Sequence, residues 1–418
     1  MKIFRSKKTK YNFSWLVFDK FARASLNFLL FIFLARYLGP QEFGILNYLL
    51  ALVFLFTSLS SLGINPVLTN ILIKNKRKTN NSIISNSYIL RFFSSLFGYL
   101  IFILFIIYLH GKNVYLSYSI IIGLSIIIKS YEVLFSYFES KSLSKYIVIS
   151  QTISLVIVFS LIVFFLYLEF DIKYIYYCFL IDSLITLFLI NIFFFKKERN
   201  FLFNLDFRKI YKIIHKSFPV LLSIISIVIY MRIDQVMINL LLSEKDVGIY
   251  SVSVRIVEMF HFIPKIIMVS YLPILLISKN YTFELIKINS LLFKISILFI
   301  FFIFVLSKYI TSILFGEIYM ESVLTTILLS ISLIFVFFGV ANEHWYISKN
   351  LQKYYALNVF IGAITNIILN YFLIQSFGIS GAAYSTILTY LLIIFLFDIF
   401  NKKTRVLLKL KYKSIITI

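Results

Sequence analysis

Residues 146–168, YIVISQTISLVIVFSLIVFFLYL, form one apolar run without a charged side chain. About twenty such residues cross the hydrocarbon core of a bilayer as a helix, whereas a barrel strand needs only about ten and alternates in polarity. Similar runs recur along all 418 residues, and 61% of the chain is hydrophobic, against about 45–50% in soluble domains. The sequence therefore predicts an all-α integral membrane protein with about twelve transmembrane helices, at 13–35, 44–68, 83–109, 114–138, 146–168, 174–195, 218–242, 247–277, 285–306, 322–346, 354–376 and 381–400.

The positive charges indicate how the chain is inserted. The net charge is +23, which in a soluble protein would suggest nucleic-acid binding, but in membrane proteins Lys and Arg collect in cytoplasmic loops. With the amino terminus inside, 28 of the 41 Lys and Arg residues lie in inner segments and only five lie in outer ones. We therefore expect both termini in the cytoplasm and no nucleic-acid partner. The first apolar run is too long for a signal peptide, so we expect it to be a membrane helix.

The two halves of the chain repeat each other. Residues 140–146 match 348–354 at an offset of 208, and Gly44 matches Gly248 at an offset of 204. Six helices per half insert in the same orientation, so the repeats are parallel, which is an architecture of transporters with the substrate path between the halves. We predict an N-terminal six-helix lobe at 1–200, a basic cytoplasmic connector at 201–217, and a C-terminal six-helix lobe with a basic cytoplasmic tail at 218–418.

The chain lacks the motifs of nucleotide, dinucleotide and zinc chemistry. It has no GxxxxGK[ST], no GxGxxG, no HExxH and no CxxC, and its four histidines are too few and too scattered for a metal site. We therefore expect no catalytic residues, no metal and no cofactor. Any transport work would come from an ion gradient, the membrane potential or the substrate's own gradient.

Ionisable residues inside the predicted spans are the candidates for function, because they are costly in lipid and usually face the bundle interior or a water-filled cavity. Arg91, Lys265 and Lys294 are cations without an obvious local partner, and Arg23 and Arg232 lie near the middle of their spans. A cavity lined by such groups would attract an anion. Arginine in particular can hold a phosphate through two parallel hydrogen bonds.

Some of these charges also have a purely structural explanation. Acids and bases spaced i,i+3 or i,i+4 lie on one helix face and can neutralise each other, and residues near span ends can extend to the headgroups. The pairs with this spacing are Asp19–Arg23, Lys129–Glu132 and Arg255–Glu258.

Two prolines and two asparagines stand out among the remaining residues in the spans. Pro264 and Pro273 interrupt the eighth predicted span, and each removes a backbone hydrogen bond, so we expect kinks. They are hinge candidates, although a static bend that helps packing would explain them equally well. Asn366 and Asn370 lie on one helix face, and we expect them to hydrogen-bond to neighbouring helices rather than to substrate.

An ordered set of short segments resembles a known family. In this order and spacing the chain is similar to the polysaccharide-unit flippases of the Wzx type, within the multidrug/oligosaccharidyl-lipid/polysaccharide exporter superfamily. The resemblance covers essentially the whole chain. It depends on the order and spacing of all the segments together, since no single motif is decisive. The segments are ARYLGPQEFG at 35–44, RIDQ at 232–235, VGIYS at 247–251, NIILN at 366–370 and FGISGAA at 377–383.

The resemblance implies a two-lobed fold like that of the multidrug and toxin exporters and a substrate made of undecaprenyl pyrophosphate carrying a short sugar repeat. Such a flippase moves the unit from the cytoplasmic to the outer leaflet of the bacterial inner membrane by alternating access, for O-antigen or capsule assembly, beside polymerase and chain-length partners. It also implies a cationic cavity and coupling to protons or sodium. The cavity candidates are Arg23, Arg91, Arg232, Asp234, Arg255, Lys265 and Lys294, and the ion-coupling candidates are Asp19, Asp234 and Glu258.

Other function classes stay open at this point. An exporter of small cationic drugs on the same fold predicts unpaired acids in the cavity, whereas the unpaired central residues here are mostly basic. A polymerase or membrane glycosyltransferase usually carries a sizeable outer loop, and the longest predicted outer connection, 307–321, has about fifteen residues. A structural membrane protein would leave the buried charges unexplained.

Overall fold

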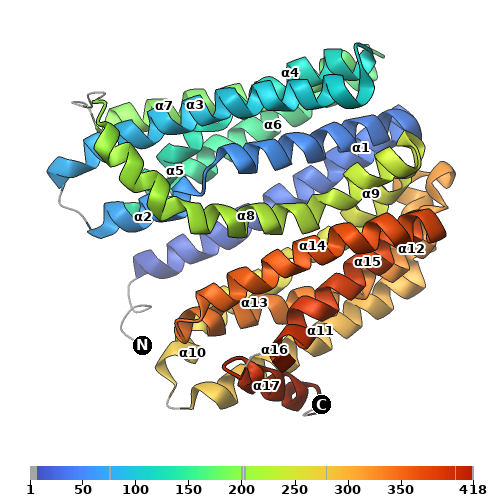
Figure 1. Ribbon diagram of the computed structural model, residues 1–418. Coiled ribbons are helices and arrows are strands. Elements are labelled where there is room, and N and C mark those ends of the chain that lie inside the picture. Colours follow the sequence, from blue (N-terminus) through green and yellow to red (C-terminus); the bar gives the residue numbers. More distant parts are fainter. Residues whose placement is uncertain are drawn as a thin grey trace. The chain divides into compact units, whose positions relative to one another are not determined.

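Helices account for nearly all of the residues that the computed structural model describes (Figure 1). Contacts divide the chain into two compact units, one formed by Tyr48–Arg232 and the other by Met1–Asn47 together with Ile233–Ile418. The predicted division at the connector 201–217 rests on the sequence repeat and stays a prediction. The structure describes residues 7–74, 77–198, 201, 204–278, 280–400 and 402–416, with the backbone alone for 7–21, 77–80, 273 and 276.

The first helix, α1 (Lys7–Ser60), carries the first predicted span and most of the second. It is kinked at Gly39, whose φ of 70° and ψ of 173° are not helical. Glycine adopts positive φ without a steric penalty, and Pro40 then starts the next helical stretch, where its missing N–H costs nothing. The connection predicted at 36–43 is therefore a kink rather than a loop.

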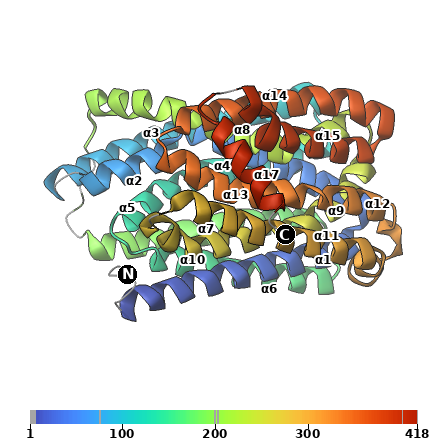
Figure 2. The ribbon, with the colours of Figure 1, turned by 90° about the horizontal axis from the view of Figure 1, so that it is seen from below.

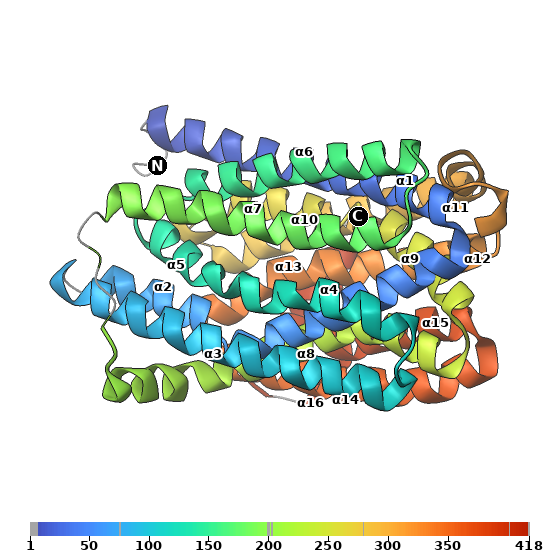
Figure 3. The ribbon, with the colours of Figure 1, turned by 90° about the horizontal axis from the view of Figure 1, so that it is seen from above.

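The unit Tyr48–Arg232 contains two helix pairs joined by short turns, α3 with α4 and α6 with α7, and further contacts between helices that are not consecutive. Contacts pair α3 with α4, α6 with α7, α4 with α7 and α2 with α5, and Figure 3 shows α3 and α4 side by side. Its core contains Tyr131, Phe138 and Phe194. After the end of α1, its elements are α2 (Ile64–Lys74), α3 (Arg77–His110), α4 (Val114–Ile128), η1 (Lys129–Glu132), α5 (Val133–Ser140), α6 (Lys145–Tyr167), α7 (Lys173–Lys197) and most of α8 (Phe207–Leu241).

The second unit contains the first part of α1, the end of α8 and all later helices. Contacts pair α14 with α15, α9 with α12, and α11 with both α13 and α17. The last helix, α17, runs obliquely across the others (Figure 2). The elements are α9 (Glu244–Glu258), α10 (Phe262–Ile277), α11 (Tyr281–Ile310), η2 (Thr311–Phe315), η3 (Glu317–Tyr319), α12 (Ser322–Ser330), α13 (Ser332–Ser348), α14 (Gln352–Phe377), α15 (Ile379–Leu391), η4 (Leu392–Leu396), α16 (Phe397–Phe400) and α17 (Arg405–Ile416).

Ten helical stretches of the described residues are long and apolar enough to cross a membrane. One of them, Ala22–Ser60, carries two predicted spans across the kink of α1. The eighth predicted span, 247–277, is divided into α9 and α10, and Pro264 lies in the first turn of α10. A proline cannot donate the helical hydrogen bond and its ring clashes with the preceding turn, which explains this break. The all-α membrane fold that the sequence predicts is confirmed.

The repeat in the sequence is also present in the backbone. Ser142 and Asn350, which are 208 residues apart, have φ values of 56° and 55° directly after a helix end. In both turns the next amide bonds the carbonyl five residues earlier at 2.8 Å, from Leu143 to Phe138 and from Leu351 to Tyr346. This is the Schellman ending of a helix, with its left-handed residue after the last turn. The two halves therefore end the corresponding helix in the same way.

The second repeated pair, Gly44 and Gly248, packs reciprocally. A Cβ on Gly44 would lie 1.8 Å from the carbonyl oxygen of Glu244, and a Cβ on Gly248 would lie 1.9 Å from that of Pro40. Each glycine thus faces the carbonyl four residues before the other. This symmetric crossing of α1 and α9 is possible only without side chains at both positions.

Candidate functional site

The carboxylate of Asp234, on α8, is buried and accepts hydrogen bonds from three neutral side chains. Tyr250 Oη and Thr386 Oγ1 donate to Oδ2 at 2.7 and 2.8 Å, and Asn370 Nδ2 donates to Oδ1 at 2.7 Å. The donors lie on α9, α15 and α14, so four helices meet at one carboxylate that is only 5% exposed. Hydrogen bonds to ionised oxygens are the stronger kind, so this arrangement stabilises the charge.

Further amides and hydroxyls continue the network from Asp234. Asn366 Nδ2 bonds Ser385 Oγ at 3.2 Å and Thr389 Oγ1 at 3.3 Å, which confirms the interhelical bonding predicted for Asn366 and Asn370. The Oδ1 atom of Asn370 is buried and has no hydrogen-bond partner among the described residues. A carboxylate beside a free amide oxygen offers the oxygen ligands that hard cations prefer, and the carboxylate can equally take a proton.

This set of groups suits a proton or a monovalent cation better than a divalent metal. Within the described residues, no three His, Cys, Asp or Glu side chains come together as a metal-binding group. One carboxylate surrounded by neutral oxygens carries a single negative charge, which one proton or one monovalent cation would balance.

Arg255 lies on α9, the helix that also carries Tyr250. Its guanidinium lies over the ring of Phe31, 3.5 Å from the centroid, and donates to Asn47 Oδ1 at 3.3 Å. It also pairs with Glu258 at 3.7 Å, so the i,i+3 pair expected from the sequence forms. Both side chains are about one-fifth exposed, at 19% and 22%, so the pair stays accessible to a charged ligand.

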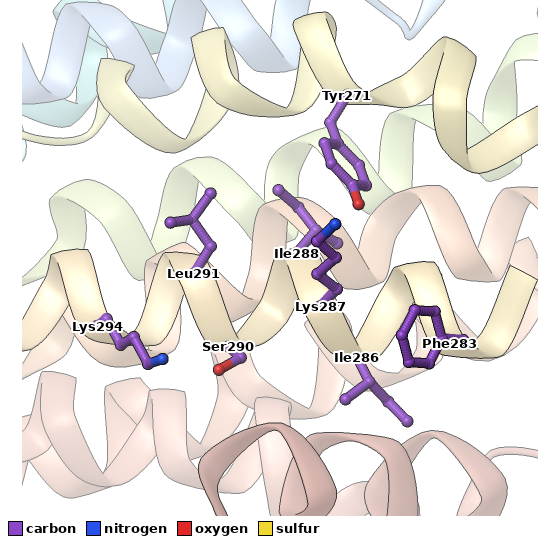
Figure 4. Close-up of a pocket in the computed structure, with 8 residues that line it drawn as sticks. All are labelled: Tyr271, Phe283, Ile286, Lys287, Ile288, Ser290, Leu291 and Lys294. Carbon is purple, nitrogen blue, oxygen red and sulfur yellow. The ribbon is translucent and has the colours of Figure 1, made fainter. Parts of the chain in front are cut away.

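Lys294 lines a pocket of about 400 Å³ on the face of α11 (Figure 4). Lys287 and Ser290 lie on the same helix face, and Tyr271 enters the pocket from α10. The two lysines are seven residues apart, which is about 10 Å along a helix. Figure 4 shows the Lys287 ammonium pointing toward the Tyr271 hydroxyl, which donates to the carboxylate of Glu284. The other lining residues are Phe283, Ile286, Ile288 and Leu291.

Arg91 is fully buried and has a partner that the sequence analysis did not identify. Its guanidinium donates to Thr57 O at 3.1 Å and pairs with Glu132 at 3.3 Å. From the sequence, Lys129 was the residue that could neutralise Glu132, and no local partner was identified for Arg91; the partner of Arg91 is distant in the sequence. Arg91 and Glu132 are 41 residues apart and meet through the packing of α3 against η1, which sequence spacing cannot indicate.

The remaining candidates are more dispersed. Arg232 is half-buried, with its guanidinium 5.8 Å from the ring centroid of Phe54, while Arg23 is half-buried on α1 and Lys265 is exposed on α10. The side chains of Asp19 and Pro273 lie outside the described residues. Within the second unit, α9 therefore connects three of the predicted positions, because it carries Arg255 and Glu258 and contacts Asp234 through Tyr250.

Three contributors to these sites did not emerge from the sequence. Tyr250 and Thr386 look like ordinary residues of apolar helices, although Tyr250 belongs to the VGIYS segment. Lys287 counted only as a basic residue near an inner connection. Its spacing of seven from Lys294, two helical turns, is the signal that could have placed both on one face.

Comparisons with known proteins support the fold. The profile described as polysaccharide biosynthesis protein matches residues 10–276. No curated protein sequence matches the chain. Among solved structures, an inward-facing multidrug resistance MATE transporter of the MOP superfamily is similar at a TM-score of 0.69 and 13% identity, covering 93% of this chain and 95% of that one. The lipid II flippase MurJ, in an inward closed conformation, is similar at a TM-score of 0.71 and 16% identity. The match covers 95% of this chain and 90% of the MurJ chain. A MOP superfamily transporter from Pyrococcus furiosus has a TM-score of 0.60 and 14% identity, with 96% of each chain covered.

Proposed function

Because the chain belongs to the polysaccharide biosynthesis protein family, we propose that it is a flippase for undecaprenyl-pyrophosphate-linked oligosaccharide repeat units. It moves them from the cytoplasmic to the outer leaflet of a bacterial inner membrane by alternating access, with both termini in the cytoplasm. The positive-inside distribution of Lys and Arg supports this orientation. Polymerase and chain-length proteins of the same pathway are its expected partners, and no catalysis is proposed.

The pocket of Lys287 and Lys294 is the observation that most favours a lipid-linked anionic substrate. Its walls combine two ammonium groups and a hydroxyl, from Ser290, with apolar side chains such as Phe283 and Leu291. An isoprenoid chain fits against apolar walls, and a pyrophosphate can bind lysine side chains whose backbone positions are about 10 Å apart along the helix. A small cationic drug would be repelled by the same two lysines, which disfavours the drug-exporter alternative.

Arg255 supplies a second anchor for an anionic group. Its guanidinium is oriented by the ring of Phe31 and by Asn47, and it pairs with the carboxylate of Glu258. A phosphate could replace the Glu258 carboxylate, because a planar guanidinium binds either oxyanion through parallel hydrogen bonds. Such an exchange would release Glu258 for protonation, which supports its place among the ion-coupling candidates.

Asp234 is the group proposed to couple transport to an ion. Protonation or cation binding there changes the charge at a junction of four helices, and it weakens the hydrogen bonds from Tyr250, Asn370 and Thr386. A change in those bonds alters how α8 is held against α9, α14 and α15. The buried charge therefore provides a physical link between an ion gradient and helix rearrangement.

The test is to delete the gene in its host and locate the lipid-linked units with a leaflet-specific label. Complementation uses wild type, the double variant Lys287→Gln/Lys294→Gln, and Lys308→Gln, which removes an exposed lysine from the same helix outside the pocket. We expect complete units to accumulate on the cytoplasmic face in the deletion strain and in the double variant, and wild-type behaviour for Lys308→Gln.

Two results would overturn the proposal. Units that reach the outer face of the deletion strain but stay unpolymerised would indicate a polymerase or glycosyltransferase instead. If the double variant complements the deletion fully, with as much protein in the membrane as wild type, the lysine pocket is not part of the substrate path.

A further inference from the structure

A groove of about 400 Å³ lies beside the C-terminal helix, between η4 and α17. Phe395, Leu408 and Ile415 supply apolar walls, and three amphipathic side chains, Lys409, Tyr412 and Lys413, complete the lining. The volume is within the range of about 300–1,000 Å³ that is usual for small-ligand sites. Because the walls are hydrocarbon, including the lysine stems, the guest that they favour is itself a hydrocarbon chain.

The helix α17 has the character of a helix at a membrane surface. It follows the last membrane span, Ile379–Phe400, after the short turn 402–404. The tail from 401 to 418 has six Lys and Arg residues and no acid, so it favours anionic surfaces. Basic amphipathic helices of this kind lie in the headgroup layer. The side chains that α17 buries are Leu407, Leu410, Lys411 and Ser414, and those it exposes are Arg405, Val406, Lys409, Tyr412, Lys413 and Ile416.

The groove is held in shape by buried polar contacts. Lys411 Nζ binds Asp398 Oδ2 at 2.7 Å and also donates to the carbonyl of Ile394, in the π-helical segment η4. Asn358 Nδ2 bonds the adjacent carbonyl of Ile393 at 2.6 Å. A π-helical turn displaces carbonyls from the regular helical pattern, and here side chains from α17 and α14 bind two of them. These contacts fix α17 against η4, so the groove is present without a ligand.

We propose that this groove binds an acyl chain of an anionic phospholipid, with the lipid phosphate held between Lys409 and Lys413. The two lysines are four residues apart, so they project from the same side of α17 on successive turns. Both are exposed and both line the groove, so they place positive charge next to the apolar walls. An anionic phospholipid has the same arrangement of a charged group next to a hydrocarbon chain. The proposal concerns a lipid that binds the tail and does not depend on which substrate is transported.

The experiment measures lipid retained by the purified full-length protein. Protein in neutral detergent is incubated with phosphatidylglycerol, with phosphatidylcholine or with a polyprenyl phosphate, and bound lipid is counted by native mass spectrometry. The groove variant is Lys409→Gln/Lys413→Gln. The matched control, Lys402→Gln/Lys403→Gln, removes the same charge from two tail lysines that do not line the groove. A third variant, Leu408→Trp, fills the groove and keeps every charge. Unfolding midpoints are recorded for all variants.

We expect wild type and the control to retain one phosphatidylglycerol and no phosphatidylcholine. In the groove variant, affinity for phosphatidylglycerol should fall about thirtyfold, the loss expected from two surface lysines. Leu408→Trp should also lose the lipid. Equal losses of phosphatidylglycerol affinity in the groove variant and the control would overturn the proposal, because they would indicate that the basic tail attracts anionic lipid without a specific site. Retention by Leu408→Trp, or preference for the polyprenyl phosphate, would also overturn the proposal.

Discussion

The ion pair between Lys411 and Asp398 provides the sharpest test of the physical reasoning. The two side chains are 1% and 0% exposed, and Tyr346 Oη donates to the second carboxylate oxygen at 2.8 Å. The pKa of the Lys411 ammonium is lowered, because the effect of burial outweighs the opposing effects of the Asp398 charge and of the hydrogen bond to it. Lys411→Met keeps the side-chain volume but removes the positive charge beside the buried Asp398 carboxylate, to which the Tyr346 hydroxyl still donates. Removing one partner of a buried pair typically costs about 3–5 kcal/mol.

The magnitude can be measured because Trp345 lies beside this cluster and is 3% exposed. Chemical unfolding in detergent micelles, followed by tryptophan fluorescence in a Trp15→Phe background so that Trp345 alone reports, should show this loss of stability for Lys411→Met. The double variant Asp398→Asn/Lys411→Met has no unpaired charge, so we expect its stability to return to within about 1 kcal/mol of wild type. Lys409→Met, on the exposed side of α17, should change little. The coupling of the buried pair is contradicted if Lys411→Met lowers the free energy of unfolding by less than about 1 kcal/mol. It is also contradicted if the effects of the two substitutions on that free energy simply add.

Three further predictions test other parts of the structure. Gly248→Ala places a Cβ 1.9 Å from a backbone carbonyl oxygen, so it should sharply reduce the yield of folded protein. The control Gly339→Ala, whose Cβ would lie 3.4 Å from its nearest neighbour, should not reduce the yield. Equal yields of the two variants would contradict the close crossing at Gly44 and Gly248. Asp234→Asn should fold normally and lose flipping in the leaflet assay, and full activity would exclude ion coupling there. Although desolvation raises it, hydrogen bonds and charge from Lys209 hold the pKa of Asp206 below its usual value. Its stabilising effect is therefore present above the unfolded pKa and is lost as the pH falls through the lowered folded pKa. The difference between the unfolding midpoints of wild type and Asp206→Ala should shrink as the pH is lowered from about 5, and a constant difference would contradict this.

The sequence predicted the helical layout well because apolar length and charge placement are local properties. The helix break before Pro264 falls where the sequence predicted a kink, whereas the kink at Gly39 stands where the sequence predicted a loop. The bonding of Asn366 and Asn370 to other helices also followed from their shared face. In each case the residue itself, or its spacing within one helix, determines the outcome.

The partners of the buried charges could not be predicted in the same way. Arg91 meets Glu132 only because α3 packs against η1, and Lys411 counted as one of six basic tail residues although the fold buries it completely. A side chain in the tail, Lys411, and a carboxylate at the end of the last span, Asp398, come together beside the π-helical η4, where Lys411 also donates to the carbonyl of Ile394. Nothing in the local sequence at Leu392–Leu396 indicates that extra residue in the turn.

The repeat separates the residues that hold the backbone from those that perform chemistry. Gly44 and Gly248 match because a side chain at either position would clash with the opposite backbone, so only one residue type fits. By contrast, the residues 204 and 208 positions before Asp234 are both leucines, and those before Asp398 are Phe194 and Ile190. The two halves thus share the positions that geometry dictates, while the buried acids of the second unit are not repeated. If ion coupling requires an acid at the place of Asp234, the matching positions of the first half, Leu26 and Leu30, do not provide one.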